Sequence, residues 1–200
     1  MNFKKTGLVV LGSLISGIGI AITIAVDLGS DPMTLFWIGI ADTLHITVGQ
    51  ANLLVCAVIL AVIFFVDRKQ IHVGSILNPI VIALVTDSLA FLDFHGLPMM
   101  GRILMMIIGF AILAFGVAFY ALADYGKGAY EALVFTLSKK LDKPVGPIRT
   151  TADILFALLG VLLGAHFALG TLLAILCMGL MIQICLKCLN KFFSDLVFQS

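Results

Sequence analysis

Arg149 and Asp153 are the residues best suited to chemistry in this sequence, because they carry charge at the start of an otherwise apolar stretch. They lie four residues apart, so a helix would place both on one face, where they can pair. A charge at bilayer depth costs roughly 2.5–3.5 kcal/mol on insertion scales, and pairing lowers that cost. We predict that both residues, with Glu131, line a cavity where Arg149 binds an anionic substrate group and one carboxylate exchanges a proton. The alternative is an ion pair near the cytoplasmic interface, with Arg149 reaching to water.

Other polar residues could reach the same cavity, because the two halves of the chain are similar and matching positions would then face each other. Asn52 stands where the second half has Arg149, and Thr34 stands where it has Glu131. The predicted substrate-binding residues are Arg149, Glu131, Asp153, Asn52, Asn78, Asp31, Thr34, Tyr130, Gln183 and Asp87. We expect no catalytic residue, no metal site and no cofactor.

Some of these residues have a structural alternative. Asn78 precedes Pro79 in the middle of an apolar segment, and a proline kink explains both residues as well as a pocket does. Asp31 precedes Pro32, a pair typical of a helix start. Asn78 and Asp87 are about half a turn out of phase, so both cannot face one site on a straight helix. Four aromatic residues fit either an interfacial anchor or a wall of the site: Trp37, Tyr120, Tyr125 and Tyr130.

Composition places the chain in a membrane. Of its 200 residues 62% are hydrophobic and 12% are charged, whereas soluble domains have about 25% charged residues. A net charge of +1 argues against nucleic-acid binding. The sequence has no Walker-type glycine loop and no nucleophile–base pair, so we expect neither an ATP-driven pump in this chain nor an enzyme. Cys185 and Cys188 form one C-x-x-C without a second pair, which favours packing over metal binding.

A shift of 97 positions superimposes one half of the sequence on the other. The matches include Gly12 with Gly109, Gly29 with Gly126 and, after a one-residue gap, Gly74 with Gly170. Self-similarity of this kind indicates a duplicated structural unit. We therefore expect a single membrane domain made of two repeats, residues 1–97 and 98–200.

Each repeat holds three long apolar segments and one short one. The long segments cover approximately residues 6–27, 48–66 and 71–92, then 102–124, 148–164 and 167–186. The short segments, between Asp31 and Asp42 and between Glu131 and Lys139, hold ten and seven uncharged residues. At 1.5 Å per residue neither crosses about 30 Å of hydrocarbon, so we predict short re-entrant or interfacial helices.

The basic residues favour six spans with both termini in the cytoplasm. This arrangement places eleven of the twelve basic residues inside and only Arg102 outside, whereas eight spans would place three outside. Three spans per repeat is an odd number, so the repeats must be oppositely oriented. The predicted fold is therefore an all-α integral membrane protein with two inverted repeats of three transmembrane helices, each with an additional short helix, as in many transporters.

Several motifs resemble those of a known group of bacterial membrane proteins. They are "LGSDP" (28–32), "VGQAN" (48–52), "GSILNPIVIALVTD" (74–87), "GKGAYEAL" (126–133), "GPIRTTAD" (146–153), "LLG" (162–164) and "GTLLAILCMGLMIQ" (170–183). Through them most of the chain is similar to the YczE/YyaS/YitT family, above all to its YczE-like branch. The family pattern has arginine where this chain has Tyr130, and glutamate is usual where it has Asp153. The resemblance implies a small multi-span protein of the bacterial cytoplasmic membrane that transports or exports small molecules.

The expected function is a secondary transporter, importer or exporter, of a small polar or amphiphilic solute. Its site would lie at the interface between the repeats, with proton coupling as an option. The alternative is a substrate-binding or accessory membrane subunit of a larger transport or biosynthetic complex, because 200 residues is small for an independent transporter. The expected partners are a small-molecule substrate and the lipid bilayer, and a homodimer is left open.

Overall fold

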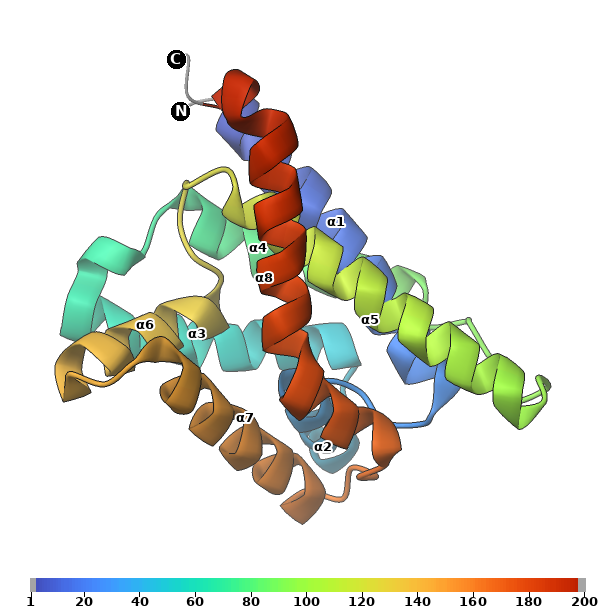
Figure 1. Ribbon diagram of the computed structural model, residues 1–200. Helices are drawn as coiled ribbons and strands as arrows, with labels where there is room; N and C mark the ends of the chain where they lie inside the picture. Colours follow the sequence, from blue (N-terminus) through green and yellow to red (C-terminus); the bar gives the residue numbers. More distant parts are fainter. Residues whose placement is uncertain (1–2, 198–200) are drawn as a thin grey trace.

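A computed structural model describes residues 3–197 of the chain, with side chains described as far as residue 191. This part of the chain forms eight α-helices and one short 3-10 turn, and its all-helical architecture confirms the expected class (Figure 1). The helices are α1 (Phe3–Val26), α2 (Pro32–Leu44), α3 (Val48–Asp67), α4 (Val73–Ser88), α5 (Met99–Ala121), α6 (Ala129–Leu141), α7 (Val145–Leu162) and α8 (Leu169–Val197), and η1 (Arg68–Gln70) follows α3.

Five helices are long and apolar enough to cross a membrane, namely α1, α3 with η1, α5, α7 and α8. The remaining predicted span is shorter than expected, because α4 has 16 residues and ends at Ser88 rather than near residue 92. At 1.5 Å per residue α4 is about 24 Å long, slightly less than the thickness of a bilayer core. The predicted short segments are confirmed as helices, since α2 and α6 have 13 residues each. The chain is a multi-pass membrane protein.

α1 and α5 lie side by side in antiparallel directions (Figure 1). Glycines allow their backbones to approach closely. A Cβ added at Gly12 would lie 2.5 Å from the backbone nitrogen of Tyr120, and one added at Gly19 would lie 2.5 Å from that of Leu113. Small residues are the usual means by which membrane helices pack without a hydrophobic driving force between them. α4 packs against α1 of this pair, and α8 packs against α5.

The two short helices lie between turns of the same kind. Positive φ angles occur at Asp27, Gly29 and His45 around α2, and at Asp124, Gly126 and Asp142 around α6. Each residue of the second set lies 97 positions after its counterpart. The matching turns end α1 and α5 and close the C-termini of α2 and α6 in the left-handed conformation. The sequence repeat is therefore accompanied by matching backbone geometry.

Two backbone hydrogen bonds join the halves of the chain. The Gly74 N–H at the start of α4 donates to the Tyr125 carbonyl after α5, at 3.0 Å. The Gly170 N–H at the start of α8 donates to the Leu28 carbonyl after α1, at 2.8 Å. Both glycines approach these carbonyls too closely for a larger residue, because an added Cβ would lie 2.5 Å from the Tyr125 oxygen at Gly74 and 2.6 Å from the Leu28 oxygen at Gly170. Each half thus docks one helix start onto the other half.

Candidate functional site

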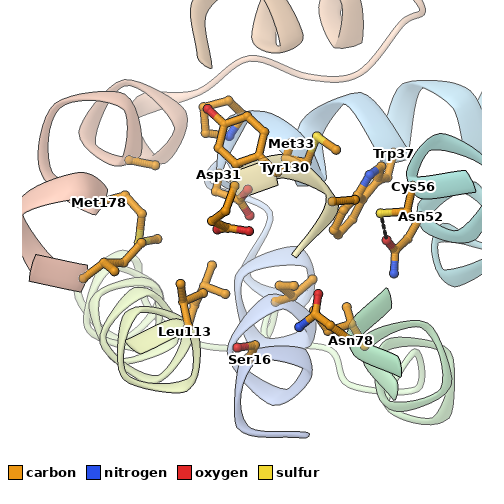
Figure 2. A pocket seen from close by; sticks show the side chains of 18 of the residues that line it. Ser16, Asp31, Met33, Trp37, Asn52, Cys56, Asn78, Leu113, Tyr130 and Met178 are labelled. Atoms are coloured by element: carbon orange, nitrogen blue, oxygen red, sulfur yellow. Dashed lines mark hydrogen bonds between the residues drawn. The ribbon is translucent and has the colours of Figure 1, made fainter. Parts of the chain in front are cut away.

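A cavity of about 90 Å³ lies in the middle of the helices, and we call it the central cavity. Each of the eight α-helices contributes to its wall, with Asp31 entering from the turn before α2 (Figure 2). Seven of the ten predicted residues line it: Arg149, Glu131, Asp153, Asn52, Asn78, Asp31 and Tyr130. Their convergence from five different elements, namely α3, α4, α6, α7 and the turn before α2, makes this cavity the candidate site. Their role in binding stays a prediction.

Arg149 and Asp153 form the expected pair on α7. The Arg149 Nε atom lies 3.9 Å from the Asp153 Oδ2 atom, and their side chains are 23% and 11% exposed. The Tyr130 hydroxyl donates a hydrogen bond to the Asp153 Oδ1 atom, and its ring lies 5.3 Å from the Arg149 guanidinium carbon. Arg149 Nε has no hydrogen-bond partner among the described residues. The pair is loose and largely buried in the cavity wall, so the guanidinium keeps donors for another group.

Glu131 occupies the first turn of α6, beside Tyr120 of α5. Its Oε2 atom and the Tyr120 hydroxyl both approach Gly128, at 2.5 Å and 2.7 Å from the place where a Cβ would stand. The two side chains interact with each other, and the Glu131 carboxylate also interacts electrostatically with Arg149. A larger residue at position 128 would displace both. Arg149 therefore faces two carboxylates, each of which also contacts a tyrosine hydroxyl.

The two asparagines act partly as structural ties. The Asn52 amide donates to the Pro79 carbonyl at 3.1 Å and joins α3 to α4. The Asn78 amide donates to the Ser13 hydroxyl at 2.9 Å and joins α4 to α1. The Cys56 thiol donates to the Asn52 Oδ1 atom at 3.1 Å. The polar atoms on this wall are thus largely satisfied by the protein, and Pro79 sits inside a continuous α4.

Asp31 and Trp37 contribute buried polar atoms without a protein partner. Asp31 caps α2, because its Oδ1 atom accepts a hydrogen bond from the Thr34 N–H at 3.2 Å. Its Oδ2 atom is buried and has no hydrogen-bond partner among the described residues. The indole N–H of Trp37 is likewise buried and unpartnered, and Trp37 is only 6% exposed. A buried polar group without a partner costs about 1–3 kcal/mol, so a polar group placed against these atoms would be stabilised.

Three predicted residues lie outside the central cavity. Thr34 is fully buried, but it packs within α2 behind the wall. Asp87 ties α4 to the start of α3, where it accepts hydrogen bonds from the Thr47 hydroxyl at 2.6 Å and the Gly49 N–H at 2.8 Å. Gln183 is exposed and lines a neighbouring hollow rather than the cavity itself. The difference in helical phase correctly predicted that Asp87 and Asn78 do not face the same site. The repeat alignment could show that Asp87 and Gln183 are equivalent, but not that their shared position faces away from the cavity.

Two larger hollows occur at matching places in the two halves. One, of about 600 Å³, lies beside α5, α6, α7 and α8, and we call it the vestibule. The other, of about 300 Å³, lies beside α1, α2, α3 and α4, and we call it the outer hollow. Matching residues line both, in the pairs Ile24 and Ala121, Val48 and Val145, Thr86 and Ile182, Asp87 and Gln183, and Ala90 and Leu186.

The vestibule adjoins the central cavity, whereas the outer hollow does not. Five residues line both the vestibule and the central cavity: Val117, Tyr120, Glu131, Arg149 and Ile182. None of the described residues that line the outer hollow also lines the cavity. Of the two matching hollows, only the vestibule therefore shares wall residues with the charged cavity in this conformation.

The structure also adds residues to the site. Trp37 and Tyr120 line the cavity, which decides between anchor and wall for these two aromatics. Apolar and small residues complete the wall, among them Ser16, Met33, Leu113 and Met178 (Figure 2). The sequence carried no signal for this last group, because an apolar residue on a membrane helix looks the same whether it faces lipid or a cavity. Among the described residues, no group of three or more His, Cys, Asp or Glu side chains is arranged to hold a metal ion.

Comparison with known proteins gives relatives of this chain but no activity. The model of a family of unknown function, DUF6198, matches residues 3–187. An uncharacterized protein of Haemophilus influenzae is 28% identical over 191 residues, covering 95% of this chain and 87% of the relative. The uncharacterized membrane protein YczE of Bacillus subtilis is 27% identical over 175 residues, covering 86% and 80%.

The uncharacterized protein YyaS of Bacillus subtilis is 20% identical over 186 residues, covering 92% of each chain. No solved structure matches the chain. These relatives confirm the resemblance seen in the motifs. Because the family model spans nearly the whole chain, the protein belongs to the DUF6198 family, whose function is unknown.

Proposed function

We propose that this protein is a secondary transporter that moves a small polar or amphiphilic solute through the central cavity. The observation that carries the proposal is a charged cavity lined by all eight helices and reached from one of two matching hollows. A binding site that opens to one side at a time is what alternating access requires. The volume of the cavity also fits this role, because a cavity of roughly 150 Å³ holds benzene and 90 Å³ holds a smaller solute or one end of a longer one.

The proposed architecture is a pair of inverted repeats of three spans and one short helix. Support comes from the matching turns around α2 and α6 and from the two reciprocal backbone hydrogen bonds between the halves. Equivalent helices also make equivalent contacts in the two halves. The packing of α1 on α4 matches that of α5 on α8, and the packing of α2 on α7 matches that of α6 on α3. The site would then lie on the pseudo-two-fold axis that relates the repeats.

In the proposed cycle the described conformation is open toward the vestibule. Lys69 and Lys127 lie at the vestibule, and the distribution of basic residues supports a cytoplasmic position for both. The cycle would close the α7–α8 side and open the α3–α4 side, so that the outer hollow reaches the cavity. The same cycle serves an importer or an exporter.

Arg149, Glu131 and Asp153 would carry the binding and coupling. Arg149 presents donors to an oxygen of the solute, and Tyr130 and Tyr120 hold the two carboxylates beside it. Protonation of either carboxylate would change the balance of charge around Arg149, which is the basis of proton coupling in this proposal. Asn52 is the uncharged counterpart of Arg149 in the first half, so only the second repeat supplies a positive charge at this position.

The test is flux through proteoliposomes that hold the purified protein and a metabolite extract, with the solutes that cross identified by mass spectrometry. We expect Arg149→Ala to lower flux by roughly a hundredfold or more, because it leaves buried carboxylates without their cation. Glu131→Gln should lower flux or remove its dependence on a proton gradient. Asp142→Asn, which changes an exposed carboxylate in the turn after α6, is the control and should behave as the wild type.

Full transport by both site variants would refute the assignment of the site. No flux by the wild type, together with a partner protein that copurifies in a fixed ratio, would refute the transporter proposal. That second outcome would favour the accessory-subunit alternative.

A further inference from the structure

We infer that the central cavity binds a small organic ammonium ion that also carries an oxygen acceptor, with the ammonium group against Asp31 Oδ2. The inference deepens the proposed function and rests on it for its biological meaning, although binding alone can test it. It depends on the charges that line the cavity, on the unpartnered atoms of Asp31 and Trp37, and on the aromatic rings around them.

The charges that line the cavity are unequal. Three carboxylates, those of Asp31, Glu131 and Asp153, face one guanidinium, that of Arg149. In a buried setting an anionic solute would add to this excess of negative charge, whereas a cation would offset it. The formal balance therefore favours a solute with at least one positive group.

Asp31 is the carboxylate that has room for that group. Asp153 contacts Tyr130 and Arg149, and Glu131 interacts with Tyr120 and Arg149. Asp31, by contrast, forms no ion pair within the described part of the chain, although the charge of Arg149 also acts on it at longer range, and its Oδ1 atom accepts from the Thr34 N–H. Its Oδ2 atom is buried and unpartnered at the wall of the cavity. An ammonium N–H would supply the missing donor and the missing charge together.

The surroundings of Asp31 suit an ammonium ion of limited size. Tyr130 and Trp37 line the same cavity as Asp31 (Figure 2), so the wall offers aromatic rings to a cation inside it. Trp37 is 6% exposed, and its buried indole N–H is a donor without an acceptor. Arg149 Nε is a second such donor. An oxygen on the solute would satisfy one of them, which is why we infer an oxygen acceptor as well as a positive charge.

The inference is tested by thermal unfolding of the purified full chain in detergent with three probes of nearly equal size. Ethanolamine carries an ammonium and a hydroxyl group, ethylene glycol carries no charge, and glycolate carries a carboxylate. A ligand that binds only the folded protein raises the midpoint of unfolding with its concentration. We expect a rise with ethanolamine, a much smaller one with ethylene glycol and none with glycolate.

Asp31→Asn is the decisive variant, because asparagine caps a helix as well as aspartate does and so should preserve α2. It should weaken ethanolamine binding by roughly ten- to a hundredfold, as expected for the loss of a hydrogen bond to a charged group. Asp42→Asn removes an exposed carboxylate from the same helix and should bind ethanolamine as the wild type does.

A larger shift with glycolate than with ethanolamine would overturn the inference, as would no shift with ethanolamine or an unchanged shift in Asp31→Asn. The proposed transport function fails separately. Ethanolamine that binds but does not cross proteoliposomes would contradict transport of this solute and leave the binding inference intact. Flux of another solute without ethanolamine binding would contradict the binding inference and leave the transport proposal intact.

Discussion

We call the interface between α3 and α4, and the matching interface between α7 and α8, the two seams of the molecule. Only the α3–α4 seam is closely packed. Gly49 of α3 lies so near α4 that an added Cβ would be 2.6 Å from the Ala83 carbonyl oxygen. Gly146, its counterpart on α7, has no atom within 4 Å of that position. The outer hollow is correspondingly smaller than the vestibule and separate from the central cavity. Similar sequences can thus pack in two ways within one chain.

The difference between the seams has a local chemical cause. Asp87 accepts hydrogen bonds from the Thr47 hydroxyl and the Gly49 N–H, so it caps α3 from α4. The second half has Gln183 in place of Asp87 and Pro144 in place of Thr47, so both the carboxylate and the hydroxyl donor are missing. A carboxylate at a helix N-terminus is favoured by the free N–H groups and by the helix dipole, whereas a neutral amide gains less. In the proposed cycle, the hydrogen bonds of Asp87 would hold the α3–α4 seam closed and would have to break for the outer hollow to reach the cavity.

Among the tests of this comparison, Asp87→Ala should have the largest effect. Loss of two hydrogen bonds to a carboxylate should lower the free energy of unfolding by about 2–3 kcal/mol and loosen the α3–α4 seam. Unfolding in detergent measures the first effect. Reaction of a cysteine introduced at Thr86 with a water-soluble thiol reagent measures the second, and should be faster when Asp87 is alanine.

Gln183→Ala is the matched control for the other seam and should change stability by less than about 0.5 kcal/mol, as is usual for an exposed residue. Equal effects of the two alanine substitutions would contradict the view that Asp87 closes its seam.

A pair of glycine substitutions gives the next largest contrast. Gly49→Ala should destabilise the protein by about 1–3 kcal/mol, because the new methyl group would meet the α4 backbone and overpack the seam. Gly146→Ala should be neutral or stabilise by up to about 1 kcal/mol, because alanine favours a helix over glycine and meets nothing there. Unfolding midpoints of the two variants check this, and the comparison fails if Gly146→Ala is as damaging as Gly49→Ala.

The same comparison explains how far the sequence could be read. Hydropathy and the 97-residue repeat located the helices, because segment length and turn residues are local properties. The short helices α2 and α6 were found because the charges around them limit their apolar length. Hydropathy overestimated α4, since apolar residues continue past Ser88 into a turn.

The site was predicted in part, and for a physical reason. Arg149, Asp153 and Glu131 stood out because charges in apolar segments are costly and must be accommodated together. The alignment of the repeats also placed Asp87 and Gln183 in this set, because alignment shows that positions are equivalent but not which way they face. Only the packing of α4 on α3 shows that Asp87 points to the seam.

The smallest effect is expected at the turns that end α1 and α5. Asp27, after α1, lies 3.4 Å from the imidazole of His95, which also contacts Asp93 at 2.6 Å. Asp124, the counterpart of Asp27, lies near Lys127 at the vestibule. The hydrogen bonds that the His95 ring donates to the Asp93 and Asp27 carboxylates raise the pKa of His95, and all three groups are exposed.

A raised pKa in the folded state means that this contact stabilises the turn at low pH. Its contribution is complete below the usual histidine pKa of about 6.5 and is lost as the pH rises through the higher folded value. We expect an NMR titration of His95 to show a midpoint above that of an unstructured histidine, and Asp93→Asn to return it toward that value. A midpoint at or below the unstructured value would contradict the contact between His95 and the two carboxylates.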